Sequence, residues 1–242
     1  MRDGVLWFAM HDTPKQLAFD LPLDPRYGRE DFLVSPSNER AYGLVERWPD
    51  WPDTVLVLHG PPGSGKSHLA SIWATDAHAW TARASEVAPD AIPHLVSNGS
   101  LVLEEGDRPE RDEAALFHLL NLARERRAFV LLTSTAPVEA WGLFTPDLLS
   151  RLRLAPSVAI EAPDDALLKA VLVKLFIDRQ LVVDTTVLDY IAPRIERSLG
   201  RAAEVVAALD REALSRGRRI SRPMAAAVLE SWSEDQEREE GE

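Results

Sequence analysis

The fold can be read from residues 55–68, VLVLHGPPGSGKSH. The first half is a continuous apolar run into a glycine, which is typical of a strand buried on both faces of a sheet. The second half, from Gly60 to Ser67, matches the pattern G-x-x-x-x-G-K-[ST] in full. A helical pattern follows over 66–76, so the order is strand, glycine-rich loop, helix. This order predicts a phosphate-binding loop in an α/β domain.

The chemistry of phosphate binding accounts for the residue types in the loop. Gly60, Gly63 and Gly65 let the backbone turn, so that its N–H groups and the helix N-terminus form a nest for phosphate oxygens. Lys66 reaches the β- and γ-phosphates, and the Ser67 hydroxyl meets magnesium. The predicted ligands are ADP or ATP with Mg²⁺. The predicted nucleotide-binding residues of this segment are Gly60, Pro61, Pro62, Gly63, Ser64, Gly65, Lys66, Ser67 and His68.

Similar apolar runs recur further along the chain, with helical patterns between them. The runs are LVLEE (101–105), AFVLLTST (128–135) and SVAIEA (157–162), and the helical patterns cover 37–48, 66–76 and 112–126. This alternation predicts a central parallel sheet with helices on both sides. After Pro163 the strand patterns stop, and residues 164–178, 185–194, 198–216 and 222–232 are predicted to be helices.

Four parts are therefore expected. Residues 1–30 form an extended N-terminal arm, 31–162 an α/β nucleotide-binding domain, 163–232 a small all-α lid domain, and 233–242 a disordered acidic tail. The arm carries the short apolar run QLAFDL, residues 16–21, which belongs to no predicted helix or strand. Taken alone, this run is either a staple that packs on the ATPase domain or an exposed binding peptide.

Composition limits the class of protein. Apolar residues make up 45% of the chain, charged residues 27%, the net charge is −12 and there is no cysteine. The negative charge argues against a general nucleic-acid binder, and the lack of cysteine excludes thiolate zinc sites and thiol catalysis. Because we find neither a signal peptide nor an apolar run of about 20 residues, we expect a cytoplasmic protein without a membrane segment.

Polar side chains follow the second and third apolar runs. Glu104 is expected to hold magnesium and Glu105 to orient the attacking water; the alternative is that both are solvated loop acids. Thr135 is expected to touch the γ-phosphate or that water; the alternative is a plain strand end. Glutamate is longer than the usual aspartate by about one C–C bond, roughly 1.5 Å, and an error of about 1 Å at a catalytic centre can cost about 100-fold in rate. We therefore expect nucleotide binding with weak or no intrinsic ATPase activity.

Two arginines complete the pattern. Arg151 lies in LLSRL, 148–152, and Arg201 lies at the start of a predicted helix in RSLGRAAEVVAALD, 197–210. Either alone is most simply a surface charge. The order of these features along the chain resembles that of the AAA+ ATPases. It runs from the phosphate loop through an acidic strand end, a polar strand end and an arginine after a leucine pair to a helical lid with an arginine.

Within the AAA+ class the chain is most similar to the bacterial replication initiator DnaA, over about residues 28–230. FLVSPSNERAYGLV, 32–45, resembles the segment that opens the DnaA ATPase domain, LLSRL its arginine-finger box, and RSLGRAAEVVAALD its second sensor. No helix-turn-helix pattern follows the lid, so we expect no direct sequence-specific DNA binding.

The arm resembles that of the Hda/HdaA family, DnaA homologues that act in the regulatory inactivation of DnaA. The resemblance implies that Gln16, Leu17, Phe19 and Leu21 anchor the chain to the β subunit of the DNA polymerase sliding clamp. It also implies that Arg151 acts in trans on ATP bound to DnaA, that Arg201 contacts the chain's own nucleotide, and that homo-oligomers can form. The implied function is negative regulation of replication initiation.

Two other functions fit parts of the sequence. A self-contained ATPase of the DnaC-like helicase-loader type would carry the same phosphate loop and arginine finger. A direct DNA binder could use the eight arginines within 194–222, although no recognition helix follows them.

Overall fold

A computed structural model describes residues 27–239, with side chains through Trp232. Its centre is a parallel sheet of five strands in the order β2-β3-β4-β1-β5. The strands are β1 (Val55–His59), β2 (Trp80–Arg83), β3 (Ser100–Glu104), β4 (Phe129–Ser134) and β5 (Ser157–Ala159). The predicted fold class, an α/β protein with a central parallel sheet, is confirmed.

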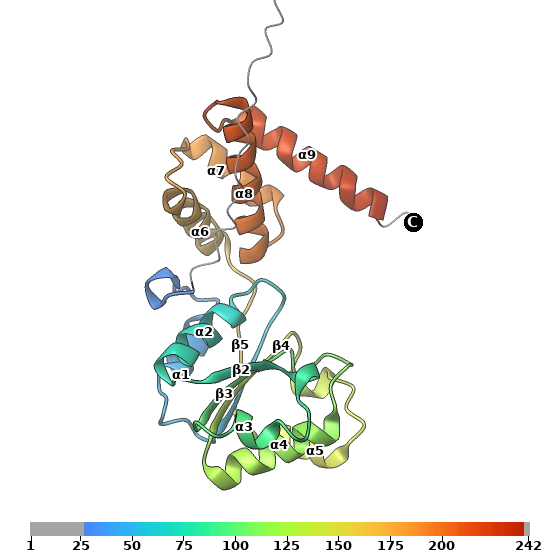
Figure 1. Ribbon diagram of the computed structural model, residues 1–242. Helices are drawn as coiled ribbons and strands as arrows, with labels where there is room; N and C mark the ends of the chain where they lie inside the picture. The colour runs from blue at the N-terminus through green and yellow to red at the C-terminus, as the bar shows by residue number, and fades with distance from the viewer. Residues whose placement is uncertain (1–26, 240–242) are drawn as a thin grey trace, which may run out of the picture.

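Helices cover both faces of the sheet (Figure 1). The helices of this part are α1 (Glu39–Val45), α2 (Lys66–Asp76), α3 (Ile92–Leu95), α4 (Glu113–Arg126) and α5 (Pro146–Leu154). Alternate residues of β1 enter different cores: Val55 and Val57 pack with α3, α4 and α5, whereas Leu56 and Leu58 pack with α1 and α2. Burial on both faces explains why β1 reads as an unbroken apolar run.

The C-terminal portion is helical and has a hydrophobic core of its own. Its helices are α6 (Asp165–Asp178), α7 (Thr185–Ile191), α8 (Leu199–Arg216) and α9 (Arg222–Glu239). Side chains preceding three of these helices accept hydrogen bonds from amides in the first turn, and the capping residues are Asp164, Asp184 and Ser198. Such caps satisfy amides that would otherwise lack a partner.

Several elements depart from the sequence-based expectation. β2, α3 and α5 were not predicted, and short 3₁₀ turns occur at Arg29–Asp31, Ala84–Glu86, Val138–Ala140 and Ala192–Arg194. β5 ends at Ala159, before the predicted end at 162. α9 continues to Glu239, past the predicted end at 232 and into the range expected to be a disordered tail, since Glu, Gln and Arg in SEDQERE favour helix. None of the helices among residues 27–239 is long and apolar enough to span a membrane.

Candidate functional site

The glycine-rich loop joins β1 to α2 as predicted, and two of its glycines are required by their surroundings. A Cβ on Gly60 would lie 2.1 Å from the carbonyl oxygen of Ile160, so only glycine fits where the loop leaves the sheet. Gly65 has a φ of 106°, in the left-handed region that favours glycine, and directly precedes α2. The loop amides are thereby brought to the N-terminus of a helix, where anions are stabilised.

Lys66 opens α2 and folds back over the loop. Its Nζ donates hydrogen bonds to the carbonyl oxygens of Gly60 (2.6 Å) and Pro61 (2.8 Å). Burial lowers the pKa of Lys66, and the negative charge of Asp107 opposes that shift. The ammonium group therefore lies at the loop, with a carboxylate near enough to act on its charge.

The helical portion touches the loop directly. The amide of Leu199 donates a hydrogen bond of 2.8 Å to the carbonyl oxygen of Gly63, and a Cβ on Gly63 would lie only 1.9 Å from Oγ of Ser198. The first turn of α8 is therefore packed against the phosphate loop. Ser198 was not predicted as a site residue, because its role depends on this long-range contact.

The carboxyl ends of β3 and β4 lie beside each other. Glu104 ends β3 and is half-buried, whereas Glu105 adopts a left-handed φ of 59° and its exposed carboxylate faces Arg108 at 3.9 Å. The Glu105 amide donates to the Thr133 hydroxyl, at 3.3 Å. The two predicted acids thus differ in exposure, since Glu104 is half-buried and Glu105 is exposed.

Asp107, which sequence reasoning missed, links the ends of β3 and β4. Its Oδ2 accepts hydrogen bonds from the amides of Thr135 (2.9 Å) and Ala136 (3.3 Å) and from the Thr135 hydroxyl. A single aspartate in a turn carries no sequence signal of its own; only its distance of two residues from Glu105 could have drawn attention to it. Thr135 therefore lies at the strand end as expected, but its hydroxyl is bonded to a carboxylate.

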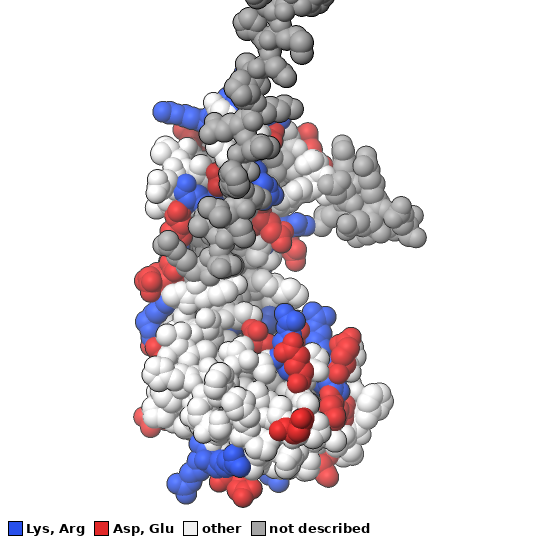
Figure 2. All heavy atoms as spheres, in the orientation of Figure 1, with Lys and Arg blue, Asp and Glu red and all other residues white. Residues whose placement is uncertain are grey.

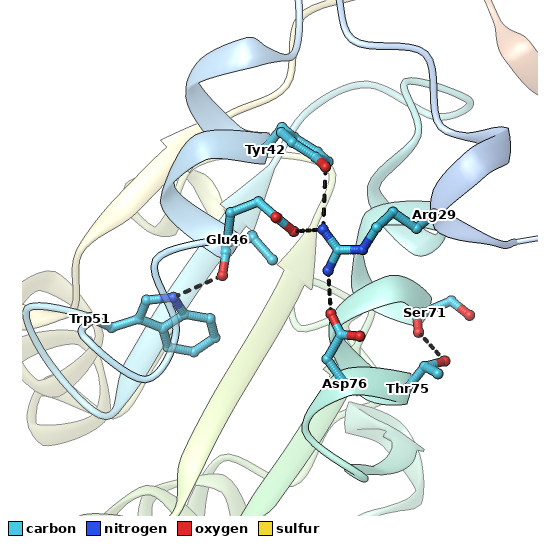
Figure 3. Close-up of polar contacts among 8 residues, drawn as sticks. Arg29, Tyr42, Glu46, Trp51, Ser71, Thr75 and Asp76 are labelled. Atoms are coloured by element: carbon cyan, nitrogen blue, oxygen red, sulfur yellow. Dashed lines mark hydrogen bonds and ion pairs between the residues drawn. The ribbon is translucent and has the colours of Figure 1, made fainter.

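The segment leading into the first helix is held by charges (Figure 3). Arg29 lies between Tyr42, Glu46 and Asp76 and donates hydrogen bonds to all three, which joins this segment to α1 and α2. Asp31, in the same segment, pairs with Lys174 of α6 at 2.7 Å. The segment therefore contacts both the α/β part and the helical portion.

His68, in the first turn of α2, contacts the segment that leads into α1. It forms a hydrogen bond of 2.9 Å with the Gly28 carbonyl and contacts the rings of Tyr27 and Phe32, at 5.3 and 5.2 Å between ring centroids. Burial lowers the pKa of His68, although the Gly28 carbonyl and Asp31 oppose the shift. These contacts join the start of α2 to residues near the end of the predicted arm, Tyr27 and Gly28, and to Phe32 just after it.

Arg151 lies on α5, which packs beside α4 on the face of the sheet opposite α2 (Figure 1). Its side chain is exposed, and the guanidinium makes no hydrogen bond or ion pair within the part of the chain that the structure describes. Its neighbour Arg153, by contrast, faces Glu139 at 3.8 Å. Arg151 is therefore free to act outside its own chain.

The N-terminus of α5 is fixed by Glu113 at the start of α4. The Glu113 carboxylate accepts hydrogen bonds from the amides of Phe144 (3.1 Å) and Thr145 (2.7 Å) and lies 3.6 Å from the buried guanidinium of Arg111. Burial raises the pKa of Glu113, but these bonds, a hydrogen bond from the Thr145 side chain and the Arg111 charge outweigh it, so the pKa lies below its usual value. The helix that carries Arg151 thus has a fixed start.

Arg201 is engaged within the helical portion. Its guanidinium pairs with Glu204 at 3.0 Å and lies 4.9 Å from the ring centroid of Trp232. It lines a cavity of about 420 Å³, together with Tyr190 and Arg194. Its backbone amide bonds to Ser198, so its α-carbon lies one helical turn from the contact with the phosphate loop.

Other arginines of the 194–222 segment are also held within the helical portion. Arg194 and Arg222 stack on Tyr190, and Arg197 pairs with Asp165 at 2.9 Å. On the face of the molecule shown in Figure 2, basic and acidic side chains are interspersed rather than gathered into one basic surface. These contacts give no support to a nucleic-acid surface built from this segment.

The described residues contain no group of three or more His, Asp or Glu side chains that could hold a metal ion by themselves. The two predicted metal-side residues, Ser67 in α2 and Glu104 at the end of β3, together supply two oxygen-bearing side chains. Mg²⁺ prefers to keep waters and to bind substrate phosphates, so these residues suit a metal that arrives with the nucleotide.

Comparison with known proteins relates the chain to the replication initiator DnaA. No protein-family model matches the sequence. The initiator DnaA of Clavibacter sepedonicus is 23% identical over 207 residues, which cover 74% of this chain and 43% of DnaA, and the DnaA of Clavibacter michiganensis gives the same values. The chain therefore spans less than half the length of the curated relatives it matches.

Solved structures extend the likeness. Domain III of Thermotoga maritima DnaA superposes with a TM-score of 0.72 at 18% identity, covering 87% of this chain and 98% of that domain. AMPPCP-bound DnaA from Aquifex aeolicus gives 0.63 at 20% identity, covering 76% of this chain and 65% of that one. The fold is a DnaA-like AAA+ fold. Thermotoga maritima RuvB, a Holliday junction branch migration motor, shares the AAA+ fold with a TM-score of 0.67 at 16% identity, covering 85% of this chain and 72% of RuvB.

The AAA+ fold and the loop together support nucleotide binding, and two of the similar DnaA structures carry the nucleotide analogue AMPPCP. The predicted clamp-binding residues, Gln16, Leu17, Phe19 and Leu21, lie outside the described residues. The roles of Glu104, Glu105, Thr135, Arg151 and Arg201 remain predictions, placed now at known positions in an AAA+ fold.

Proposed function

We propose that this chain is a nucleotide-binding AAA+ adaptor that docks on the DNA polymerase sliding clamp and stimulates ATP hydrolysis by DnaA. It would thereby act as a negative regulator of replication initiation. The observation that carries the proposal is the exposed guanidinium of Arg151, which has no partner among the described residues and lies on a helix across the sheet from α2. An arginine in this place suits action on a neighbouring protein's nucleotide.

The mechanism rests on charge. An arginine finger that reaches a transferred phosphoryl group from a partner stabilises the charge that develops there, and this is worth about 10³–10⁵ in rate. Arg151 would supply that charge to ATP on DnaA. Glu113 fixes the start of α5, and Phe144, just before that start, is 93% exposed. An apolar ring on an anchored backbone is a suitable contact for the same partner.

The chain's own nucleotide would serve binding rather than turnover. The loop amides and Lys66 would hold the phosphates of ADP or ATP, Ser67 and Glu104 would face Mg²⁺, and that bound metal would neutralise phosphate charge. Glu105 faces Arg108 at 3.9 Å, and we propose that it serves this contact rather than orienting an attacking water. We therefore propose weak or no intrinsic ATPase activity.

The clamp contact would come from the arm. Gln16 gives a polar head, and Leu17, Phe19 and Leu21 give apolar anchors on alternate residues of an extended peptide. Such a segment can order in a groove when it binds. Arg29, near the end of the arm, and Asp31, just after it, fix this part of the chain to α1, α2 and α6, so a docked arm would hold the whole AAA+ part near the clamp.

The test is ATP hydrolysis by DnaA, measured with and without DNA-loaded clamp and this protein. The proposal predicts stimulation only when clamp and adaptor are both present, and loss of stimulation in Gln16→Ala/Leu17→Ala. DNA-stimulated hydrolysis by this chain alone, without DnaA, would instead identify a self-contained ATPase of the helicase-loader type.

A further inference from the structure

Asp107 occupies a position between the strand ends and the phosphate loop that none of the roles above uses. β4 lies between β3 and β1 in the sheet, and β1 leads into the loop. Asp107 follows β3 and is bonded through Oδ2 to Thr135 and Ala136, just after β4. Three hydrogen bonds to one oxygen hold this carboxylate in a single orientation.

These bonds change what Thr135 can offer a nucleotide. An ionised carboxylate only accepts hydrogen bonds, so the Thr135 hydroxyl and amide are the donors and Asp107 is the acceptor. A hydroxyl has one hydrogen to donate. While Asp107 holds that hydrogen, Thr135 has none for the oxygens of a γ-phosphate.

The second oxygen of Asp107 faces the interior. Oδ1 is shielded from solvent and has no hydrogen-bond partner within the part of the chain that the structure describes. The Asp107 charge acts on Lys66, the residue that reaches the β- and γ-phosphates. A carboxylate with one unpaired, shielded oxygen is a negative charge that water screens poorly.

We propose that Asp107 determines how strongly the site discriminates between a nucleoside diphosphate and a triphosphate, by repelling the third phosphate and withholding the Thr135 hydroxyl from it. This inference rests on the nucleotide binding proposed above. Because Lys66 reaches the β- and γ-phosphates and the Asp107 charge acts on Lys66, a γ-phosphate would bring further negative charge toward Asp107, whereas a diphosphate would not. Specificity of this kind arises from repulsion of the disfavoured ligand.

The experiment measures the affinities of the full chain for ADP and for a non-hydrolysable ATP analogue, each with Mg²⁺ and with a chelator. The wild type should bind ADP more tightly than the analogue. Asp107→Asn removes the charge with little change of shape, and the ratio of the two affinities should move toward the triphosphate by about 10-fold, the size expected for a nearby like charge of moderate screening.

Glu110→Gln is the matched control, because it removes one exposed carboxylate from the same loop and should leave the ratio unchanged. Equal affinities in the wild type would overturn the inference even if Asp107→Asn does not fold. An unchanged ratio of affinities in folded Asp107→Asn would overturn it too. So would a loss of triphosphate affinity in Asp107→Asn that occurs only with Mg²⁺, because that result would make Asp107 a metal-side acid. Failure of the wild type to bind either nucleotide would refute the proposed nucleotide binding itself.

Discussion

The amide of Leu199 donates a hydrogen bond of 2.8 Å to the carbonyl oxygen of Gly63, and so joins the helical portion to the phosphate loop. Gly63 has a φ of 69°, and a Cβ there would meet Ser198 Oγ at 1.9 Å. A nucleotide held by the loop is therefore held next to α8. Any change that separates these two residues should alter nucleotide binding and the placement of the lid together.

Gly63→Ala tests this relationship. The added methyl must displace Ser198 or shift the loop, and we expect nucleotide affinity to fall by at least about 10-fold, because one lost hydrogen bond from a loop amide to a charged phosphate costs about 1.5–3 kcal/mol. Isothermal titration with ADP measures the loss. Gly142→Ala is the control, since Gly142 has a similar φ of 64° but open space where the methyl would lie. Equal losses of affinity in both variants would show that the contact with Ser198 has no role.

Glu113→Gln should loosen the start of α5. The carboxylate accepts hydrogen bonds from two amides and faces Arg111. A hydrogen bond to a charged group contributes about 1.5–3 kcal/mol to stability. We expect the free energy of unfolding to fall by about 2 kcal/mol at pH 7. Urea denaturation of the variant, with Glu110→Gln as an exposed control, measures it.

The same variant has a defined pH dependence. The pKa of Glu113 lies below its usual 4.5 in the folded chain, so its stabilising contribution is complete above about pH 4.5 and is lost as the pH falls through the folded pKa. The difference in unfolding free energy between wild type and Glu113→Gln should therefore shrink below pH 4.5. A difference that stays constant down to pH 3 would contradict the assignment.

Arg29→Ala should remove the ion pairs with Glu46 and Asp76 and lower stability by a small amount. The Arg29 side chain is 44% exposed, and exposed ion pairs contribute about 0–1 kcal/mol. We expect a loss of about 1 kcal/mol in stability that becomes smaller as salt rises, because salt screens exposed charges. Thermal unfolding at low and high salt, with Arg40→Ala as an exposed arginine on α1, measures it. A loss that does not depend on salt would point to packing of the side chain instead.

The sequence was informative where burial is complete. β1, β3 and β4 are covered by helices on both faces, so each contains an unbroken run of three or four apolar residues that is visible in the sequence. β2 was missed because it is an edge strand whose residues are mostly exposed, as at Trp80 and Arg83. α5 was missed because a helix of nine residues that begins at Pro146 gives a short periodic pattern.

The candidate site divides in the same way. The phosphate loop could be predicted because its chemistry requires contiguous residues of fixed type. Asp107 and Ser198 could not, because Asp107 acts by bonding across to the end of β4, and Ser198 by meeting Gly63 from a distant helix. Contacts between residues far apart in sequence leave no local pattern.

The role of Arg151 in trans is the central claim, and one measurement tests it most directly: the rate of ATP hydrolysis by DnaA on DNA-loaded clamp, with Arg151→Ala compared with Arg153→Ala. Both variants remove an exposed arginine from α5, but within the part of the chain that the structure describes only Arg153 pairs with an acidic side chain, Glu139. We predict that Arg151→Ala binds clamp and nucleotide normally yet loses stimulation by about 10³-fold or to background, whereas Arg153→Ala retains it. Full stimulation by Arg151→Ala would contradict the account.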